Sequence, residues 1–175
     1  MQMMGLKIIP YWASWLAYYT FVNTVISFVT CIILGTNVTN SFFSWILFLA
    51  FWLFGQSLFG LMLITQSIFS SARAAAIVSS LIFFGSSSVN YAISDDDTST
   101  SSIMWACLSP TTAIIKVISV LAKFETSPVG SSLDNIFAEY QNFTVGHGLI
   151  MLAVDCVWLA VFGLYLELVM PKNIG

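Results

Sequence analysis

Charged residues are what this sequence lacks most. Only 7% of its 175 residues are Asp, Glu, Lys or Arg, whereas 58% are hydrophobic, and a soluble domain carries about a quarter of charged residues. No charged residue occurs between Lys7 and Arg73, that is, from position 8 to position 72. A water-facing surface of ordinary composition does not accommodate such a stretch. The composition therefore excludes a soluble enzyme and predicts an all-α, polytopic membrane protein.

Basic residues and metal ligands are scarce as well. The five Lys and Arg residues are scattered singly, so no basic stripe follows a phosphate backbone, and nucleic acid is not an expected partner. His147 is the only histidine, and the three cysteines lack metal-ligand spacing, which argues against a metal site and a His-based triad. The run from Gly55 to Gly60 has the glycine spacing of a phosphate loop, but Leu61 and Met62 stand where Lys and Ser/Thr are required. We expect no catalytic residue and no cofactor in this chain.

Four segments are long and apolar enough to cross a bilayer, which takes about 20 residues. They cover residues 14–34, 42–66, 74–93 and 149–170. The last of these contains Asp155 and Glu167. Its twelve Leu, Ile, Val and Phe residues contribute about −0.3 to −0.6 kcal/mol each, which outweighs about +3 kcal/mol for one central acidic residue. Insertion of all four segments is therefore expected.

A fifth segment, 103–121, decides how many times the chain crosses the membrane. It is apolar but contains Lys116, and it either spans, giving five spans, or forms a re-entrant helical hairpin over 103–140 on the exoplasmic side, giving four. The distribution of basic residues fits both models equally. Two glycosylation sequons begin at Asn37 and Asn142, and only the four-span model places both outside the cytosol. The sequons therefore favour four spans.

Two polar features of the spans have alternative interpretations. Asp155, expected about two turns into the last span, either fixes helix packing through a hydrogen bond or contacts a polar group of a substrate, because intramembrane carboxylates are costly and usually face protein or water. Lys116 is its most plausible charge partner if the hairpin packs on the last span. Ser71, Ala75 and Ser79 recur every four residues, which indicates a helix-packing ridge rather than a conduction path.

The order of short motifs resembles subfamily A of the ABC transporters. Residues 1–6 (MQMMGL) and 11–15 (YWASW) resemble the family's Met-rich "MxMMGL…YWxSW" signature. Residues 108–113 (LSPTTA) resemble its "LxPxxA" segment, and residues 151–175 resemble its "MLxxDxxxYxxLxWYxxxVxPGxyG" ending. The ending departs from the pattern at Trp158, Leu164 and Lys172. Essentially the whole chain is covered by these landmarks.

This resemblance implies an incomplete half of an ATP-driven exporter that moves or flips lipids. It implies four spans with the exoplasmic hairpin, residues 1–11 as the end of a cytosolic coupling helix, and residues 171–175 as the start of a linker to a nucleotide-binding domain. The residues implied to couple to that domain are Met3, Met4, Gly5 and Leu6. ATP and Mg²⁺ would bind in the nucleotide-binding domain, so this chain would not itself be an enzyme. The implied partners are membrane lipids, the nucleotide-binding domain and a second transmembrane half in the same polypeptide, in the plasma membrane or an endomembrane.

A different class of function fits the same spans. A free-standing four-span structural or scaffold protein would also lack a nucleotide site, and it would insert and fold without a transporter around it. An intramembrane enzyme would need a second catalytic group near Asp155, which the sequence does not supply.

Overall fold

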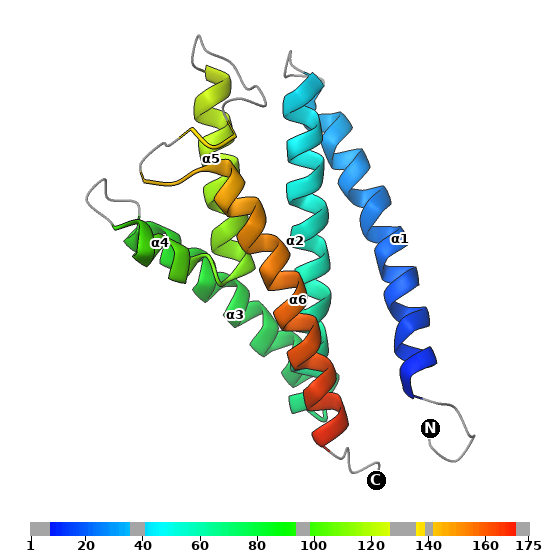
Figure 1. Cartoon of the computed structure of the whole chain (residues 1–175). Helices are drawn as coiled ribbons and strands as arrows, with labels where there is room; N and C mark the ends of the chain where they lie inside the picture. Colours follow the sequence, from blue (N-terminus) through cyan, green and yellow to red (C-terminus); the bar gives the residue numbers. More distant parts are fainter. Residues whose placement is uncertain (1–7, 36–40, 94–98, 127–135, 139–141, 171–175) are drawn as a thin grey trace.

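The computed structural model describes residues 8–35, 41–93, 99–126, 136–138 and 142–170. These residues form six α-helices, which follow one another along the chain (Figure 1). Their bounds are α1 (Ile8–Gly35), α2 (Ser41–Ile68), α3 (Ala72–Ala92), α4 (Thr100–Ala106), α5 (Pro110–Thr126) and α6 (Val145–Val169). Helices α1, α2, α3 and α6 are long and apolar enough to cross a membrane. The chain is therefore a multi-pass, all-helical membrane protein.

The ends of two spans differ from those predicted. α1 already begins at Ile8, and Pro10 is tolerated there because the first N–H groups of a helix have no partner within it. Residues 8–11, predicted as the last part of a coupling helix, thus lie in α1, whose candidate span is Pro10–Leu34, whereas residues 1–7 lie outside the described residues. α6 begins at Val145 because the side chain of Thr144 accepts a hydrogen bond from the backbone N–H of His147, which caps the helix. Asp155 consequently lies ten residues, about 15 Å, along α6, deeper than the two turns predicted.

The segment predicted over 103–121 is not one helix. The chain leaves α4 through a turn in which the N–H groups of Leu108 and Ser109 donate to the carbonyls of Trp105 and Ala106. Pro110 then starts α5, a position that suits proline because its missing N–H is not needed there. The predicted segment is therefore divided between the end of α4 and most of α5. Most of the stretch up to Tyr140, predicted as the second arm of the hairpin, lies outside the described residues, so the hairpin over 103–140 stays a prediction.

The four long helices alternate in direction. α1 begins and α6 ends at the same end of the bundle, which is also where α2 joins α3 (Figure 1). α5 runs toward the opposite end, where α1 ends and α2 begins. Along the chain α4 and α5 lie between α3 and α6, and neither is among the four described helices long and apolar enough to cross a membrane.

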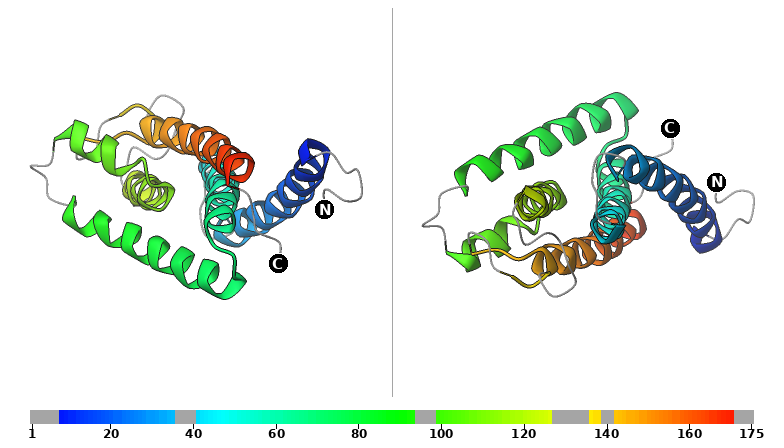
Figure 2. Two further views of the ribbon diagram at one scale, coloured as in Figure 1. Left: turned by 90° about the horizontal axis from the view of Figure 1, so that it is seen from below. Right: turned by 90° about the horizontal axis from the view of Figure 1, so that it is seen from above.

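Two helices organise the packing. α2 contacts α1, α3, α5 and α6, and α5 contacts α2, α3 and α6 (Figure 2). The main apolar core lies where α2, α5 and α6 meet and includes Leu47, Ala50, Val117, Leu121 and Leu152. By contrast, no residue of the apolar window of α3 is buried in the described part of the chain. α3 is therefore the span with the most surface left for lipid or for another protein.

Candidate functional site

Glycines bring α2 and α6 into close contact. A Cβ atom added to Gly60 would lie 2.6 Å from Leu159 Cβ and 2.8 Å from the backbone nitrogen of Ala160. A Cβ atom added to Gly163 would lie 2.7 Å from Leu63 Cβ. In lipid, where packing replaces the hydrophobic drive between helices, such small residues allow the backbones to approach. The α2–α6 interface is thus a tight, fixed contact.

Two hydrogen bonds cross the same interface. Cys156 Sγ donates to the carbonyl of Leu53 at 3.0 Å, and Ser67 Oγ donates to Glu167 Oε2 at 3.0 Å. The second bond lies in the last turns of both helices, so it gives the carboxylate of Glu167 a partner near the end of the span. The glycine contacts and these two hydrogen bonds together hold α2 against α6.

Polar side chains also join α1 to α2. Tyr19 Oη donates to the carbonyl of Gly55 at 2.9 Å, and Asn23 Nδ2 donates to the carbonyl of Trp52 at 3.0 Å. Trp52 Nε1 donates in return to Thr24 Oγ1 at 3.0 Å. A Cβ atom on Gly55 would meet the amide of Asn23, so the glycine provides the space for this network. We call these contacts the α1–α2 seam.

The seam was missed in the sequence analysis, although its pattern is present in the sequence. Tyr19, Asn23, Ser27 and Cys31 recur every four residues and therefore share one face of α1. Ser27 is buried, and Cys31 Sγ donates to the carbonyl of Ser44 at 2.9 Å. Hydrogen-bonding side chains that recur every four residues could therefore have predicted this polar face of α1.

The run from Gly55 to Gly60, which has the glycine spacing of a phosphate loop, lies inside α2. Its backbone N–H groups donate within the helix and do not face a phosphate.

Asp155 is fully buried in α6. Its Oδ1 accepts a hydrogen bond from Trp158 Nε1 at 2.9 Å, and its Oδ2 has no hydrogen-bond partner among the described residues. Lys116 instead donates from Nζ to the carbonyl of Ile93 at 2.9 Å, at the C-terminal cap of α3. A cation there satisfies a free carbonyl and complements the negative end of the helix dipole. The predicted pair of Asp155 and Lys116 is therefore not formed.

Asp155 and Lys116 nevertheless both affect Cys107, in the turn between α4 and α5. Burial raises the pKa of Cys107, at that turn, to about 12; the charge of Lys116 lowers this pKa and that of Asp155 raises it. One turn before Lys116, Thr112 Oγ1 donates to the carbonyl of Ser86 at 3.1 Å. Two successive turns of α5 therefore hold α3 through its backbone carbonyls.

The remaining predicted positions are divided between described and undescribed residues. Met3, Met4, Gly5, Leu6, Asn37 and the stretch 171–175 lie outside the described residues. Asn142 is exposed with a φ of 57°, a left-handed conformation that asparagine tolerates better than most residues. The other two positions of its sequon, Phe143 and Thr144, are buried. His147 Nδ1 lies 2.7 Å from Thr144 Oγ1, consistent with a structural role at the helix start.

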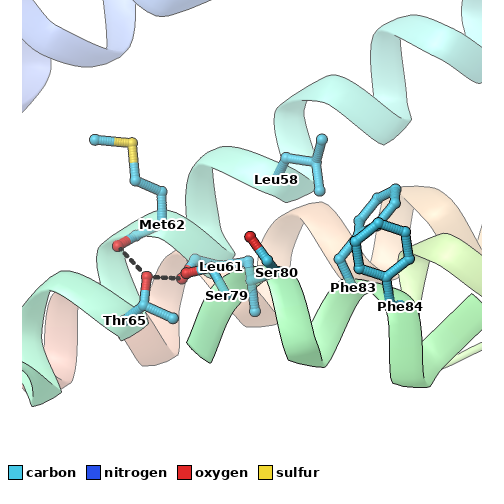
Figure 3. A pocket seen from close by; sticks show the side chains of 8 residues that line it. All are labelled: Leu58, Leu61, Met62, Thr65, Ser79, Ser80, Phe83 and Phe84. Carbon is cyan, nitrogen blue, oxygen red and sulfur yellow. Dashed lines mark hydrogen bonds between the residues drawn. The ribbon is translucent and has the colours of Figure 1, made fainter. Parts of the chain in front are cut away.

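A groove lies between α2 and α3. It has a volume of about 340 Å³, and the side chains in Figure 3 line it from both helices. Those from α2 are Leu58, Leu61, Met62 and Thr65, and those from α3 are Ser79, Ser80, Phe83 and Phe84. Ser79, from the predicted packing ridge, thus faces an open groove. We call this feature the α2–α3 groove.

No protein-family model matches the chain, and no curated protein sequence matches it. Its function is therefore inferred from its residues and its fold.

Proposed function

We propose that this chain is the membrane-spanning part of an ATP-driven transporter that exports or flips lipids. The observation that carries the proposal is the placement of the first residue of α1 and the last residue of α6 at the same end of the bundle (Figure 1). A domain attached after α6 and one docked before α1 then meet on one side of the membrane. This is the arrangement that the motif resemblance to subfamily A of the ABC transporters requires.

The contacts within the bundle join helices that would move together in a transporter. α2 and α6 are locked by Gly60, Gly163 and two hydrogen bonds, so a displacement of the end of α6 is passed to α2. α1 follows α2 through the α1–α2 seam. In the proposed transporter, ATP and Mg²⁺ bind in a separate nucleotide-binding domain, and Met3, Met4, Gly5 and Leu6 contact that domain. This chain then contributes no catalytic residue.

Lipid is the proposed cargo because the open surfaces of the spans offer little to a polar solute. The walls of the α2–α3 groove carry no charged side chain. The exposed faces of α1 and α3 carry many large apolar residues, including Phe21, Ile26, Ile77 and Leu81. Such surfaces are compatible with hydrocarbon and are unfavourable for ions or sugars.

Reconstitution tests the proposal directly. The protein, isolated from its native membrane with the proteins bound to it, is placed in phosphatidylcholine vesicles that contain a fluorescent phospholipid. We expect Mg²⁺- and ATP-dependent movement of the probe between leaflets, abolished by a non-hydrolysable ATP analogue. A preparation that holds the intact chain but neither hydrolyses ATP nor moves the probe contradicts the proposal.

A free-standing scaffold is the second candidate. It is favoured by the number of fixed contacts between α1, α2 and α6, which need no partner to form. A scaffold inserts and folds alone and gives the negative outcome of the reconstitution.

A further inference from the structure

The α2–α3 groove lies within the membrane. Its residues belong to the spans Ser44–Ile68 and Ala72–Tyr91, in the second half of α2 and the middle of α3. The groove therefore lies toward the end of the bundle where these helices join, which is also where α6 ends (Figure 1). Its natural surroundings are the acyl chains of that leaflet.

The hydroxyl groups in the groove are already engaged. Thr65 Oγ1 donates to the carbonyls of Leu61 and Met62 at 3.1 and 3.0 Å, as Figure 3 shows. Ser79 and Ser80 donate to the carbonyls four residues earlier, at 2.7 and 2.9 Å. The remaining lining side chains are apolar. The walls thus present no free donor, which selects an apolar occupant over a polar one.

The size of the groove limits that occupant further. Ligand pockets range from about 300 to 1,000 Å³, and this groove, at about 340 Å³, is at the small end. It accommodates a single hydrocarbon chain rather than a whole phospholipid.

One basic residue lies below the groove on the same helical face. Arg73 is in the first turn of α3 and precedes Ser80 by seven residues and Phe84 by eleven. At about 100° per residue these positions differ from Arg73 by only about 20° around the axis, and Ser80 is about 10 Å away along it. Arg73 is exposed, and within the described part of the chain no hydrogen bond or ion pair engages it. Among the described residues its guanidinium is therefore unengaged, at the end of the span and on the same helical face as the apolar groove.

We propose that the α2–α3 groove binds one acyl chain of an anionic phospholipid and that Arg73 binds its phosphate. A guanidinium matches a phosphate in geometry and bonds it in a bidentate manner. An anionic lipid is preferred because its headgroup keeps a net negative charge, worth about 1 kcal/mol per basic residue at a membrane surface, whereas the ammonium of phosphatidylcholine neutralises its phosphate. The proposal rests on the lipid-handling function above and names the lipid class and its site. The lipid belongs to the leaflet on the side where α2 joins α3.

Photolabelling tests this site without ATP. The protein, with its bound partners, is reconstituted in phosphatidylcholine vesicles containing a trace of phosphatidylserine with a diazirine on one acyl chain, and a parallel sample contains the phosphatidylcholine probe. Labelled residues are mapped by mass spectrometry. We expect labels on the groove-lining residues of α2 and α3, with more from the phosphatidylserine probe.

Variants of the apolar walls have a matched control. Ser80→Trp fills the groove from α3, and Met62→Trp fills it from α2; both should remove groove labelling by either probe. Gly85→Trp is the control, because a Cβ atom at Gly85 meets nothing within 4 Å, and it should leave labelling unchanged. Each variant is first checked for helix content and monodispersity, and the two groove variants allow the test to proceed if one misfolds.

Substitutions of Arg73 test whether this residue binds the headgroup of the lipid. Arg73→Gln should lower labelling by phosphatidylserine about fivefold, the factor associated with one basic residue at an anionic membrane surface, to the level of phosphatidylcholine. Arg73→Lys should retain most of the preference.

Four outcomes overturn the proposal. Three come from photolabelling: labels spread evenly over the exposed faces of α1 and α3, groove labelling that both tryptophan variants leave intact, and a preference for phosphatidylserine that Arg73→Gln does not change. The fourth is a chemical cross-link between a groove-lining residue and a helix of a bound partner protein, which would show that a protein helix occupies the groove. Labelling needs no ATP, so the two proposals can fail separately. ATP-driven lipid movement without labels in the groove refutes this site alone. Labels in the groove without ATP-driven lipid movement refute the transport function.

Discussion

The glycine contact between α2 and α6 allows a quantitative prediction. Gly60→Ala adds one methyl group, whose carbon would lie 2.6 Å from Leu159 Cβ and 2.8 Å from the nitrogen of Ala160. Carbon atoms in contact are normally 3.5–4.0 Å apart, so the two helices have to separate by about 1 Å. The clash is with backbone and Cβ atoms rather than with the end of a flexible side chain, so no rotamer change relieves it.

Separation by this amount weakens the whole interface. A gap of 0.5–1 Å forfeits about a quarter to a half of each van der Waals contact. The bonds from Cys156 to Leu53 and from Ser67 to Glu167, both 3.0 Å, stretch beyond good hydrogen-bond length, and each such interhelical bond in a membrane is worth about 0.6 kcal/mol. Together with the usual cost of overpacking, we expect the free energy of unfolding to fall by about 1–3 kcal/mol.

Gly85→Ala is the matched control for this substitution. The same change is made in another span at a position with nothing within 4 Å, so the free energy of unfolding should stay constant or rise by up to about 1 kcal/mol from helix propensity. Titration with SDS in mixed micelles, followed by circular dichroism, measures both differences. The reasoning is refuted if Gly60→Ala unfolds at the same SDS fraction as the wild type, or if the two alanine variants are equally destabilised.

Four further results are expected. Asn23→Leu, which removes a hydrogen bond from α1 to α2, should lower the free energy of unfolding by about 0.6–1.7 kcal/mol in the same titration; no change would mean that the α1–α2 seam contributes nothing. A double-mutant cycle of Lys116→Met and Asp155→Asn should give a coupling below about 0.5 kcal/mol, and a larger value would indicate the ion pair that the structure lacks. Cys107 should resist maleimide from pH 7 to 9, because burial raises its pKa to about 12 and keeps the thiol protonated; labelling of the native protein would contradict this. Tags placed at the two ends of the chain should be accessible from the same side of the membrane, and accessibility from opposite sides would mean an odd number of spans.

The spans could be predicted from the sequence because hydropathy is summed locally. Each long apolar run has to be compared only with the thickness of the bilayer, so four crossing helices and their approximate ends followed without knowledge of their neighbours. The errors occurred at capped ends and turns. Thr144 extends α6 backward, and the break at Ser109 and Pro110 divides the segment 103–121 into α4 and α5, because single hydrogen bonds rather than average hydropathy decide those boundaries.

The partners of the polar residues were decided only by the tertiary structure. The sequence identified Asp155 and Lys116 as unusual within apolar segments, yet Lys116 binds the end of α3 and Asp155 binds Trp158. The α1–α2 seam and the α2–α3 groove likewise depend on which helix faces meet and how closely. A bilayer selects segments by their average polarity, whereas a hydrogen bond or a glycine contact is made or lost within about 1 Å, and that precision arises only when the helices pack.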